Sequence, residues 1–170
     1  MDTHSQPVTP AAPTPRPTPH DGDANAEDVV ALVERFAERW ARPDADRLME
    51  LCHRDVRFIA PLMSPTVGFD SCREEFRRLI ALRPDIHIEV HRWSARGNVV
   101  FIELTIHCTI GGEAVRMPGV DRLVLKDGLI IERVAYADPL PVIWALLKHP
   151  TEWRRWWRSG IGPPTRPCRL

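Results

Sequence analysis

The chain has 170 residues, 44% of them hydrophobic, and its 23 acidic and 23 basic residues balance to a formal net charge of +0. This length suits one domain built around a single core. The balanced charge excludes the strong overall field by which proteins attract nucleic acid or an anionic membrane, so we expect neither as a partner.

Four cysteines are scattered through the chain without the spacing of a zinc site or a redox motif, at Cys52, Cys72, Cys108 and Cys168. Scattered thiols are typical of a reducing compartment. The sequence also lacks an apolar secretory signal and any run of roughly 18 apolar residues that would span a bilayer. These features together predict a cytoplasmic protein with free thiols.

Residues 1–26 contain six prolines, mainly in a run from Pro13 to Pro19, and almost no apolar side chains. Such a segment cannot bury enough surface to offset the entropy lost on ordering, so we predict a disordered leader with local polyproline character. A ligand for a partner that binds PxxP motifs is the alternative interpretation.

The first helix is predicted over residues 27–41. Apolar side chains recur there at steps of three and four residues, which places on one face Val29, Val33, Phe36 and Trp40. Pro43 ends this helix, and Asp44 is the expected N-cap of a short second helix.

A turn at His53–Asp55 is expected to lead into a strand over residues 56–59. The third helix is predicted to begin at Ser71, with Glu74 three residues later completing a capping box. It should end before Pro84, because the residue before a proline disfavours helical geometry.

From residue 86 onward the hydrophobic period changes from helical to two, which is the period of a half-buried strand. Four strands are predicted, over residues 86–91, 100–110, 115–125 and 129–136, with tight turns at Gly111–Gly112 and Asp127–Gly128. Three helices followed by an antiparallel meander predict an α+β fold, a cone-shaped curved sheet whose helices enclose a pocket. The outer sheet face is left for solvent or for a second copy of the chain.

Residues 141–159 combine a short apolar helix, ended by Pro150, with three tryptophans and three arginines between Trp153 and Arg158. We interpret this segment as a lid over the open end of the cone or as a subunit interface. A membrane-surface contact is the third interpretation, although six residues with three arginines are too few for a stable anchor. Residues 160–170 are expected to fray.

Short stretches that follow one another in a characteristic order are residues 51–58 (LCHRDVRF), 119–123 (GVDRL), 126–132 (KDGLIIE) and 134–139 (VAYADP). In this order they resemble the nuclear-transport-factor-2-like superfamily, which includes SnoaL-like polyketide cyclases, ketosteroid isomerases and limonene-epoxide hydrolases. The resemblance covers about residues 27–140 and implies one domain of this fold. It says less about activity, because the fold hosts many chemistries and also non-catalytic binders.

The resemblance implies roles for four positions. Asp121 falls where the isomerases have an acidic hydrogen-bond donor and where the cyclases have an acid/base aspartate. Phe36 falls at the isomerase tyrosine, Ala60 at the proton-shuttling carboxylate, and Ala135 at an aspartate of the epoxide hydrolases. Because these last three positions carry no ionisable group, we do not expect the usual mechanisms of steroid isomerisation or epoxide opening.

The surroundings of Asp121 single it out independently, because it alternates with Leu123 and Leu125 on the predicted inner face. Burial there would raise the pKa of its carboxyl group and keep a proton available for acid/base work. A structural role, in which Asp121 bonds to Arg116, Arg122 or a backbone amide, is the alternative.

Two further polar side chains are candidates for the site. Arg133 shares a face with Ala135 and would reach the cavity, where it would pair with Asp121 or with an anionic substrate. Such a pair would lower the pKa of Asp121, so the two roles compete. His107 lies opposite the apolar stripe of its strand and is interpreted first as a solvent or dimer-side residue; a flipped strand would make it an acid/base candidate.

His87, Glu89 and His91 share one strand face and at first sight suggest a metal site. They alternate with Ile86 and Ile88, which need the core, so we predict that the three polar residues face outward and that no metal is bound.

The favoured hypothesis is a small-molecule enzyme that transfers protons in a cyclisation, isomerisation or epoxide hydration of a mostly apolar substrate, without metal or organic cofactor. Its catalytic candidates are Asp121, Arg133 and His107, and its substrate-binding candidates are Phe36, Trp40, Ala60, Met63, Ile102, Leu104, Ile106, Met117 and Ala135. The rival hypothesis is a non-catalytic ligand-binding or accessory dimer. The resemblance implies a homodimer through the outer sheet face in either case.

Overall fold

The computed structural model describes residues 26–161, which form five helices and six strands. The elements are, in chain order, α1 (Ala26–Ala41), α2 (Ala45–Met49), β1 (Cys52–Ile59), β2 (Thr66–Val67), α3 (Phe69–Leu82), β3 (His87–Arg96), β4 (Val99–Ile110), β5 (Glu113–Lys126), β6 (Leu129–Ala137), α4 (Leu140–Lys148) and α5 (Pro150–Ser159). Most of the predicted leader and tail, including Cys168, lies outside the described residues.

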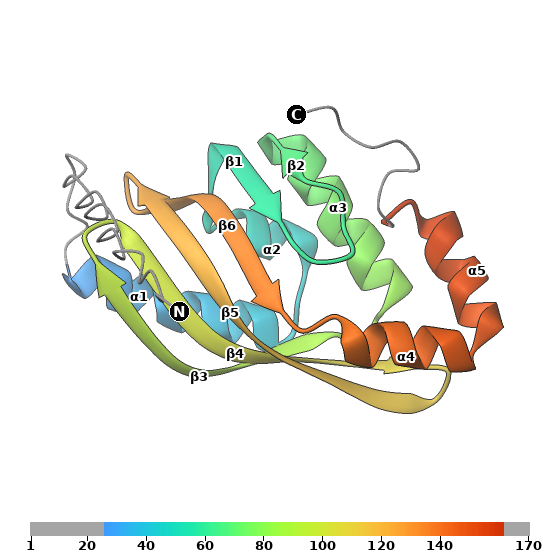
Figure 1. Ribbon diagram of the computed structural model, residues 1–170. Helices are drawn as coiled ribbons and strands as arrows, with labels where there is room; N and C mark the ends of the chain where they lie inside the picture. Colours follow the sequence, from blue (N-terminus) through green and yellow to red (C-terminus); the bar gives the residue numbers. More distant parts are fainter. Residues whose placement is uncertain (1–25, 162–170) are drawn as a thin grey trace, which may run out of the picture.

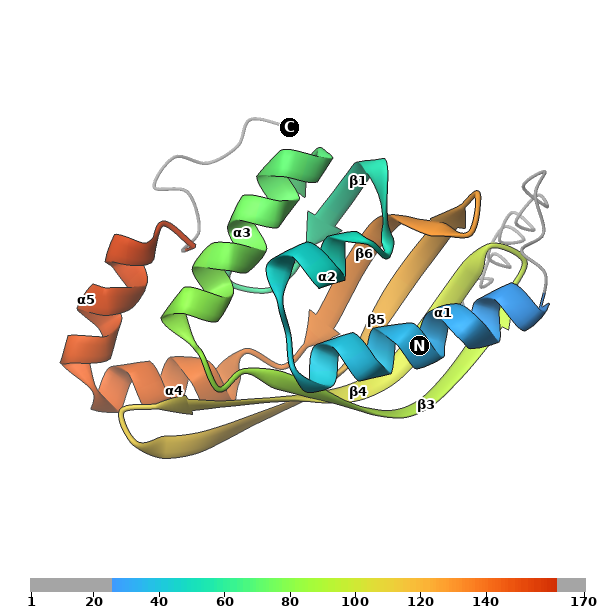
Figure 2. The same cartoon turned by 180° about the vertical axis from the view of Figure 1, so that it is seen from behind.

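The six strands form one curved, open sheet in the order β2-β1-β6-β5-β4-β3 (Figure 1). Strands β3 to β6 are the predicted antiparallel meander, whereas β1 runs parallel to β6 and β2 lies at the edge. Helices α1, α2 and α3 lie on one side of the sheet, behind it in Figure 1 and in front of it in Figure 2. The predicted α+β fold class is therefore confirmed.

The first two helices follow the sequence prediction. The face of α1 that the helical period selected is buried, and it includes Phe36 and Trp40, which are 1% and 3% exposed. At α2 the carboxylate of Asp44 accepts hydrogen bonds from the backbone N–H groups of Asp46 and Arg47, both at 3.0 Å. Asp44 thus caps the helix as expected.

Helix α3 begins earlier than the sequence predicted, at Phe69 rather than at Ser71. Its N-cap is Gly68, which has a φ of 91° that glycine adopts readily, and no side chain caps the helix. The predicted capping box of Ser71 and Glu74 is wrong, since Glu74 lies within the helix and pairs with Arg78 at 3.1 Å. The short strand β2 brings the chain into this glycine and sets the start of α3.

Strand β1 is longer than predicted, because His53–Asp55 lie in the strand and not in a turn. The register with β6 shifts between Cys52 and Arg57. Such an irregularity disrupts the alternation of side chains that reveals a strand in a sequence.

The turns of the meander lie at the predicted glycines. Gly111 has a φ of 59°, and a Cβ atom there would clash with the ring of His149, so the tip of the β4–β5 hairpin packs against the junction of α4 and α5. Further along the hairpin, the register places Asp121 of β5 between Ile102 of β4 and Ala135 of β6.

Buried side chains form two clusters. The larger one fills the space between α1, α2, α3 and the inner sheet face. The smaller one lies where α4 packs on the ends of β4 and β5, and it includes Ile110, Val115 and Leu146. Within the described range, none of the helices is both long and apolar enough to cross a membrane.

Candidate active site

A cavity of about 160 Å³ lies between the helices and the inner sheet face. Its walls come from the end of α1, from the end of β1 and residues 60–66, from α3, from strands β3 to β6, and from α4 and α5. Most lining side chains are apolar, and the charged ones are Glu75, Arg83 and Arg133. An apolar cavity of about 150 Å³ holds benzene, so this volume suits a small ring or a short chain.

Six of the nine predicted substrate-binding residues line this cavity, namely Trp40, Ala60, Met63, Ile106, Met117 and Ala135. Phe36, Ile102 and Leu104 do not line it, and the prediction of Ile102 and Leu104 as cavity residues is corrected. Phe36 borders a second, smaller pocket of about 10 Å³, which Trp40 and Arg133 also line. Phe36, Ile102 and Leu104 are at most 1% exposed and belong to the larger core cluster. The inner sheet face extends beyond the cavity. Ile102 and Leu104 lie on the part of this face that the helices cover, so they belong to the core and not to the cavity wall.

Asp121 points inward as predicted and is 1% exposed. Its Oδ2 accepts a hydrogen bond of 2.7 Å from Nε of Arg133, while its Oδ1 is buried and has no hydrogen-bond partner among the described residues. Burial raises the pKa of Asp121 above its ordinary value, and the guanidinium of Arg133 opposes that rise. Asp121 itself is not among the residues that line the cavity.

Arg133 is the member of this ion pair that lines the cavity, so its positive charge lies at the cavity wall. Its guanidinium carbon lies 4.6 Å from the centre of the Trp40 ring and 5.5 Å from that of Phe36, within the range of cation–π attraction. The Nη groups of Arg133 make no hydrogen bond with any residue in 26–161, so these donors are left for a ligand. The ion pair between Arg133 and Asp121 that the sequence suggested is present, since it is formed through Nε of Arg133.

His107 lies on the outer sheet face, between Ile106 and Cys108, which line the cavity. Its ring stacks on His87 with 4.8 Å between centroids, and its Nε2 lies 3.3 Å from Oε2 of Glu89. The flipped strand that would have brought His107 into the cavity is excluded, and its place among the catalytic candidates is corrected. The first interpretation, of an outward residue, is confirmed.

The other polar groups of the outer face and the cysteines offer no further chemistry to the cavity. His87, Glu89 and His91 are exposed as predicted, and the part of the chain from 26 to 161 contains no cluster of side chains suited to a metal ion. Burial raises the pKa of the Cys108 thiol, which lines the cavity, to about 11. At neutral pH this thiol is protonated and a poor nucleophile.

Glu75 is a charged residue of the cavity that the sequence analysis missed. It is 9% exposed and forms no hydrogen bond or ion pair with any described residue. Burial raises the pKa of its carboxyl group, the charge of Arg78 opposes this rise, and that of Glu74 adds to it. The helical period could have indicated that Glu75 faces inward, because Glu75 precedes Leu79 by one turn and Leu82 by two. Both leucines line the cavity.

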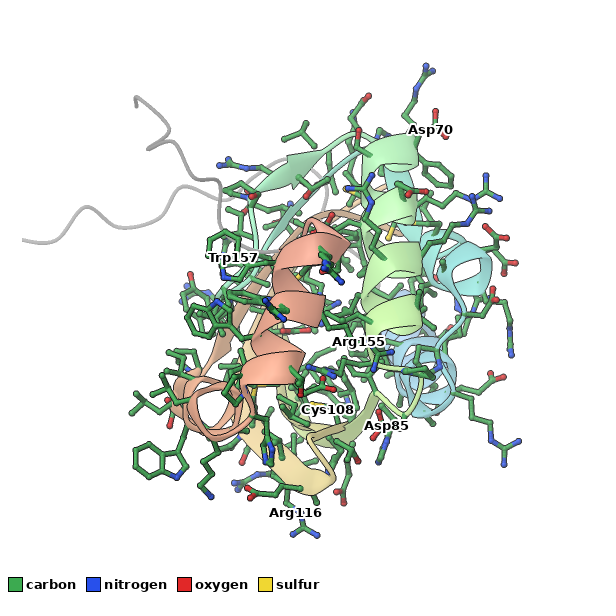
Figure 3. The ribbon with its side chains drawn as sticks, turned by 90° about the vertical axis from the view of Figure 1, so that its right-hand side faces the viewer. Asp70, Asp85, Cys108, Arg116, Arg155 and Trp157 are labelled. Carbon is green, nitrogen blue, oxygen red and sulfur yellow. The ribbon has the colours of Figure 1, made fainter. Side chains whose placement is uncertain are left out.

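Helix α5 closes one side of the cavity with Trp156, and Ile161 follows just beyond the helix. Nη1 of Arg83 at the end of α3 donates a 2.5 Å hydrogen bond to Oε2 of Glu152 on α5, and both side chains are largely buried. Figure 3 shows α5 beside α3, with Arg155 on the side facing α3 and Trp157 on the opposite side. The predicted Trp/Arg segment is thus a helix that borders the cavity.

Comparison with protein families gives a match to the SnoaL-like domain over residues 33–133. Among curated protein sequences, none matches the chain at a significant level. The family match includes the three charged residues of the cavity and ends before α4 and α5.

Solved structures with a similar fold include a putative SnoaL-like polyketide cyclase from Jannaschia sp. CCS1, with a TM-score of 0.63 and 21% identity over 72% of this chain and 95% of that one. An epoxide hydrolase from M. tuberculosis, described as LEH-like, has a TM-score of 0.61 and 21% identity over 75% of this chain and 96% of its own. A putative hydroxylase from Streptomyces galilaeus has a TM-score of 0.60 and 20% identity over 72% of this chain and 97% of its own. At these identities the similarity shows the fold.

Proposed function

Because the chain belongs to the SnoaL-like domain family, we propose that it is an enzyme that moves protons on a small, mostly apolar substrate without a metal or an organic cofactor. Cyclisation, isomerisation and epoxide hydration are the reactions of this type that we consider. Relatives described as a polyketide cyclase and an epoxide hydrolase support an enzymatic role.

The observation that carries the proposal is the arrangement of Arg133 in the apolar cavity. Its Nε is held by the buried carboxylate of Asp121, and its Nη groups have no acceptor among the described residues. In a mostly apolar cavity, such a fixed donor stabilises negative charge that develops on a substrate oxygen. Arg133 is therefore proposed as the group that binds the reacting oxygen of a carbonyl or an epoxide.

Asp121 has two possible roles in this proposal. The acid/base role suggested by the sequence stays a prediction, supported by the raised pKa and by the free Oδ1. Its ion pair with Arg133, and its absence from the cavity wall, favour a positioning role, in which Asp121 fixes the orientation of the guanidinium. Kinetic measurements on variants distinguish the two roles. A substitute side chain that restores the orientation of the Arg133 guanidinium partly rescues the loss of a positioning residue.

The test uses a panel of small substrates with the full chain. Deuterium uptake from D₂O into cyclohexanone and indan-2-one is followed by NMR, and hydration of styrene oxide by chromatography. We expect turnover of at least one compound by the wild type and its loss in the double variant Arg133→Met/Asp121→Asn, which removes both charges together and leaves neither unpaired. Arg47→Met, in the exposed ion pair with Glu38 on the helical side of the domain, is the matched control.

A non-catalytic ligand-binding protein is the second candidate. It is favoured by the three positions at which the resemblance implies catalytic groups, because none of them carries an ionisable side chain here. Phe36 is buried in the core, and Ala60 and Ala135 line the cavity. Quenching of tryptophan fluorescence by the panel compounds, without turnover of any of them, would support this candidate against the enzyme, since Trp40 and Trp156 line the cavity.

We also propose a homodimer through the outer sheet face. This face is not covered by α1, α2 or α3, and it exposes the aromatic side chains of Phe101 and Tyr136, at 43% and 59%. Exposed aromatic side chains are enriched at protein interfaces.

A further inference from the structure

Helices α4 and α5 expose a group of large apolar side chains to solvent. On α4 these side chains recur at steps of four and three residues and are 61% to 65% exposed, and on α5 they lie one turn apart and are 39% and 43% exposed. They form the Trp/Leu patch, which consists of Leu140, Trp144, Leu147, Trp153 and Trp157. Single exposed apolar side chains are common, whereas a group of them marks an interaction site.

The two helices present this patch on one side of the domain. Helix α5 follows α4 directly, across His149 and Pro150, and the two helices pack on each other. Figure 3 shows α4, seen end-on, on the side of α5 that carries Trp157 and faces away from α3. The ring centroids of Trp153 and Trp157 lie 6.4 Å apart. The patch is therefore a surface of the α4–α5 pair and not a set of isolated side chains.

Basic residues border the Trp/Leu patch. From residue 153 to residue 170 the sequence contains no acidic residue, and its basic residues are Arg154, Arg155, Arg158, Arg166 and Arg169. Arg154 and Arg158 are exposed and form no ion pair within residues 26–161. Glu152, just before them, is largely buried and bonds to Arg83 on the side of the cavity. The positive charge at this end of the domain is therefore local, although the chain as a whole is neutral.

We propose that the Trp/Leu patch docks on a membrane surface that carries anionic lipids. Tryptophan rings are enriched at the depth of the lipid headgroups, because the ring is apolar and its N–H group can still reach a polar partner. Leucine side chains beside them reach the boundary of the acyl chains, and arginines bind the lipid phosphates. Helix α5 has the pattern of such a helix, with Trp153 and Trp157 on one face and arginines on the other.

This surface is larger and more strongly charged than the sequence indicated. The six residues from Trp153 to Arg158 are too few for a stable anchor, but α4 adds Leu140, Trp144 and Leu147 to the same side. The balanced charge of the whole chain does not decide the contact, because salt screens exposed charges beyond roughly 8 Å. An anionic leaflet therefore meets the arginines of α5 and not the acidic residues elsewhere on the domain.

A second copy of the chain and a nucleic acid fit the patch less well. Two copies related by a two-fold axis would bring Arg154 and Arg158 of both chains to one interface, where like charges repel. A single-stranded nucleic acid would stack its bases on the tryptophans and place its phosphates on the arginines. It would leave exposed Leu140 and Leu147, which are 65% and 61% exposed in the domain. A lipid surface takes up the leucines, the tryptophans and the charges together.

The patch and the cavity lie on opposite faces of the same two helices. The inward faces of α4 and α5 line the cavity with Leu146 and Trp156. A docked domain thus holds the cavity one helix away from the lipid, in which small apolar compounds dissolve. The inference does not depend on the proposed function, because a non-catalytic binder of apolar ligands would dock in the same way.

The experiment is flotation of the full chain with two kinds of vesicle, one of phosphatidylcholine alone and one of phosphatidylcholine mixed with phosphatidylglycerol. Trp144→Ser removes a ring of the patch, and Trp93→Ser, at an exposed tryptophan of β3, is its matched control. Circular dichroism checks that each variant is folded.

A second pair of variants tests the charges. Arg154→Gln/Arg158→Gln removes two unpaired arginines of α5. Arg35→Gln/Arg42→Gln removes two exposed arginines at α1 and just beyond it, and is the matched control. Flotation of all variants at low and high salt separates the electrostatic contribution from the apolar one.

We expect the wild type to float with the mixed vesicles and much less with phosphatidylcholine alone, and this binding to weaken as salt rises. Trp144→Ser should bind about tenfold more weakly, because one large apolar side chain is no longer withdrawn from water. Arg154→Gln/Arg158→Gln should lose about tenfold or more, since each basic residue near an anionic leaflet contributes roughly fivefold. Both control variants should bind like the wild type.

A wild type that does not float with the mixed vesicles overturns the proposal, as does flotation of Trp144→Ser at the strength of the wild type. Equal binding to both kinds of vesicle overturns the assignment of anionic lipid. Without vesicles, a dimer that Trp144→Ser dissociates would show that a second copy covers the patch. Binding of a single-stranded oligonucleotide but of no vesicle would show a nucleic-acid site, and either of these two results also overturns the proposal.

Discussion

At the scale of single residues, Asp121 and Arg133 form a buried ion pair beside the cavity. Both side chains are nearly buried, at 1% and 8% exposure, so each charge depends on the other for compensation. A buried ion pair adds little net stability compared with apolar side chains, but removal of one member leaves an uncompensated charge. The pair is therefore better explained by the charge that it presents to the cavity than by stability.

Asp121→Asn should destabilise the protein by about 3–5 kcal/mol, because it leaves Arg133 buried without its counter-ion. The double variant Asp121→Asn/Arg133→Met should recover most of that loss. Urea unfolding followed by circular dichroism measures both, with Glu38→Gln in the exposed pair with Arg47 as the control. A single variant as stable as the wild type would show that the pair is solvated.

Glu75 gives a prediction about the pH dependence of stability. Its pKa is raised from 4.5 in the folded protein, so the folded state binds this proton more tightly than the unfolded state does. Stability is then highest at low pH for this group and falls as the pH rises from about 4.5 through the folded pKa. Glu75→Gln removes this loss.

Thermal unfolding from pH 4 to pH 8 tests this sign. The melting temperature of Glu75→Gln should exceed that of the wild type at pH 7, and the difference should shrink toward pH 4. Glu74→Gln serves as the control with an exposed carboxylate. A difference that grows as the pH falls would mean that Glu75 is stabilised as a carboxylate.

At the scale of elements, α5 is the helix whose removal would change the cavity most. It lies outside the family match and contributes Trp156 to the wall. Its own apolar contacts are few, since none of its residues is fully buried, and it contacts only α3 and α4 appreciably. The Arg83–Glu152 bond is accordingly its main polar attachment to the domain. Such an element belongs to the part of a structure that opens most readily.

Glu152→Ala should therefore release α5 while the domain stays folded. Hydrogen exchange measured by mass spectrometry should show faster exchange in residues 150–159 and unchanged protection in α1 and in strands β4 and β5. Arg155→Ala, which alters only an exposed contact of 3.9 Å to Glu152, should leave α5 protected. Equal protection of α5 in Glu152→Ala and wild type would show that apolar packing alone holds the helix.

At the scale of the whole molecule, helices on one side and an open sheet face on the other give the domain two different surfaces (Figures 1 and 2). The open face carries ion pairs, such as Arg92 with Glu103, beside the exposed Phe101 and Tyr136. A second copy of the chain on this face would bury both aromatic rings and leave the cavity, on the opposite side of the sheet, accessible.

Light scattering at micromolar concentration should give the mass of a dimer for the wild type and of a monomer for Phe101→Arg, because a desolvated charge at the centre of the interface is costly. The variant Arg54→Ala, at an exposed residue of β1, is a control for unspecific effects of surface change. A wild type that is monomeric under these conditions rules out the proposed dimer.

Much of the architecture could be predicted from the sequence, because it depends on local periodicity. The steps of three and four residues in α1 and the alternation through β4 and β5 identify which side chains face inward, Asp121 among them. Turn glycines such as Gly111 and the cap Asp44 mark the ends of elements through their own backbone chemistry. These features require no knowledge of what lies across the core.

The sequence by itself determined that this chain is an α+β domain with an acidic side chain inside it. Only the tertiary structure decided which inward residues border the cavity and which fill the core, and it separated Ala135 from Ile102 although the register makes both neighbours of Asp121. It also brought Glu75 on a helix and Arg133 on a strand to one cavity. The physical reason is that a residue's period fixes the face it occupies, whereas its chemical surroundings depend on which distant element packs against that face.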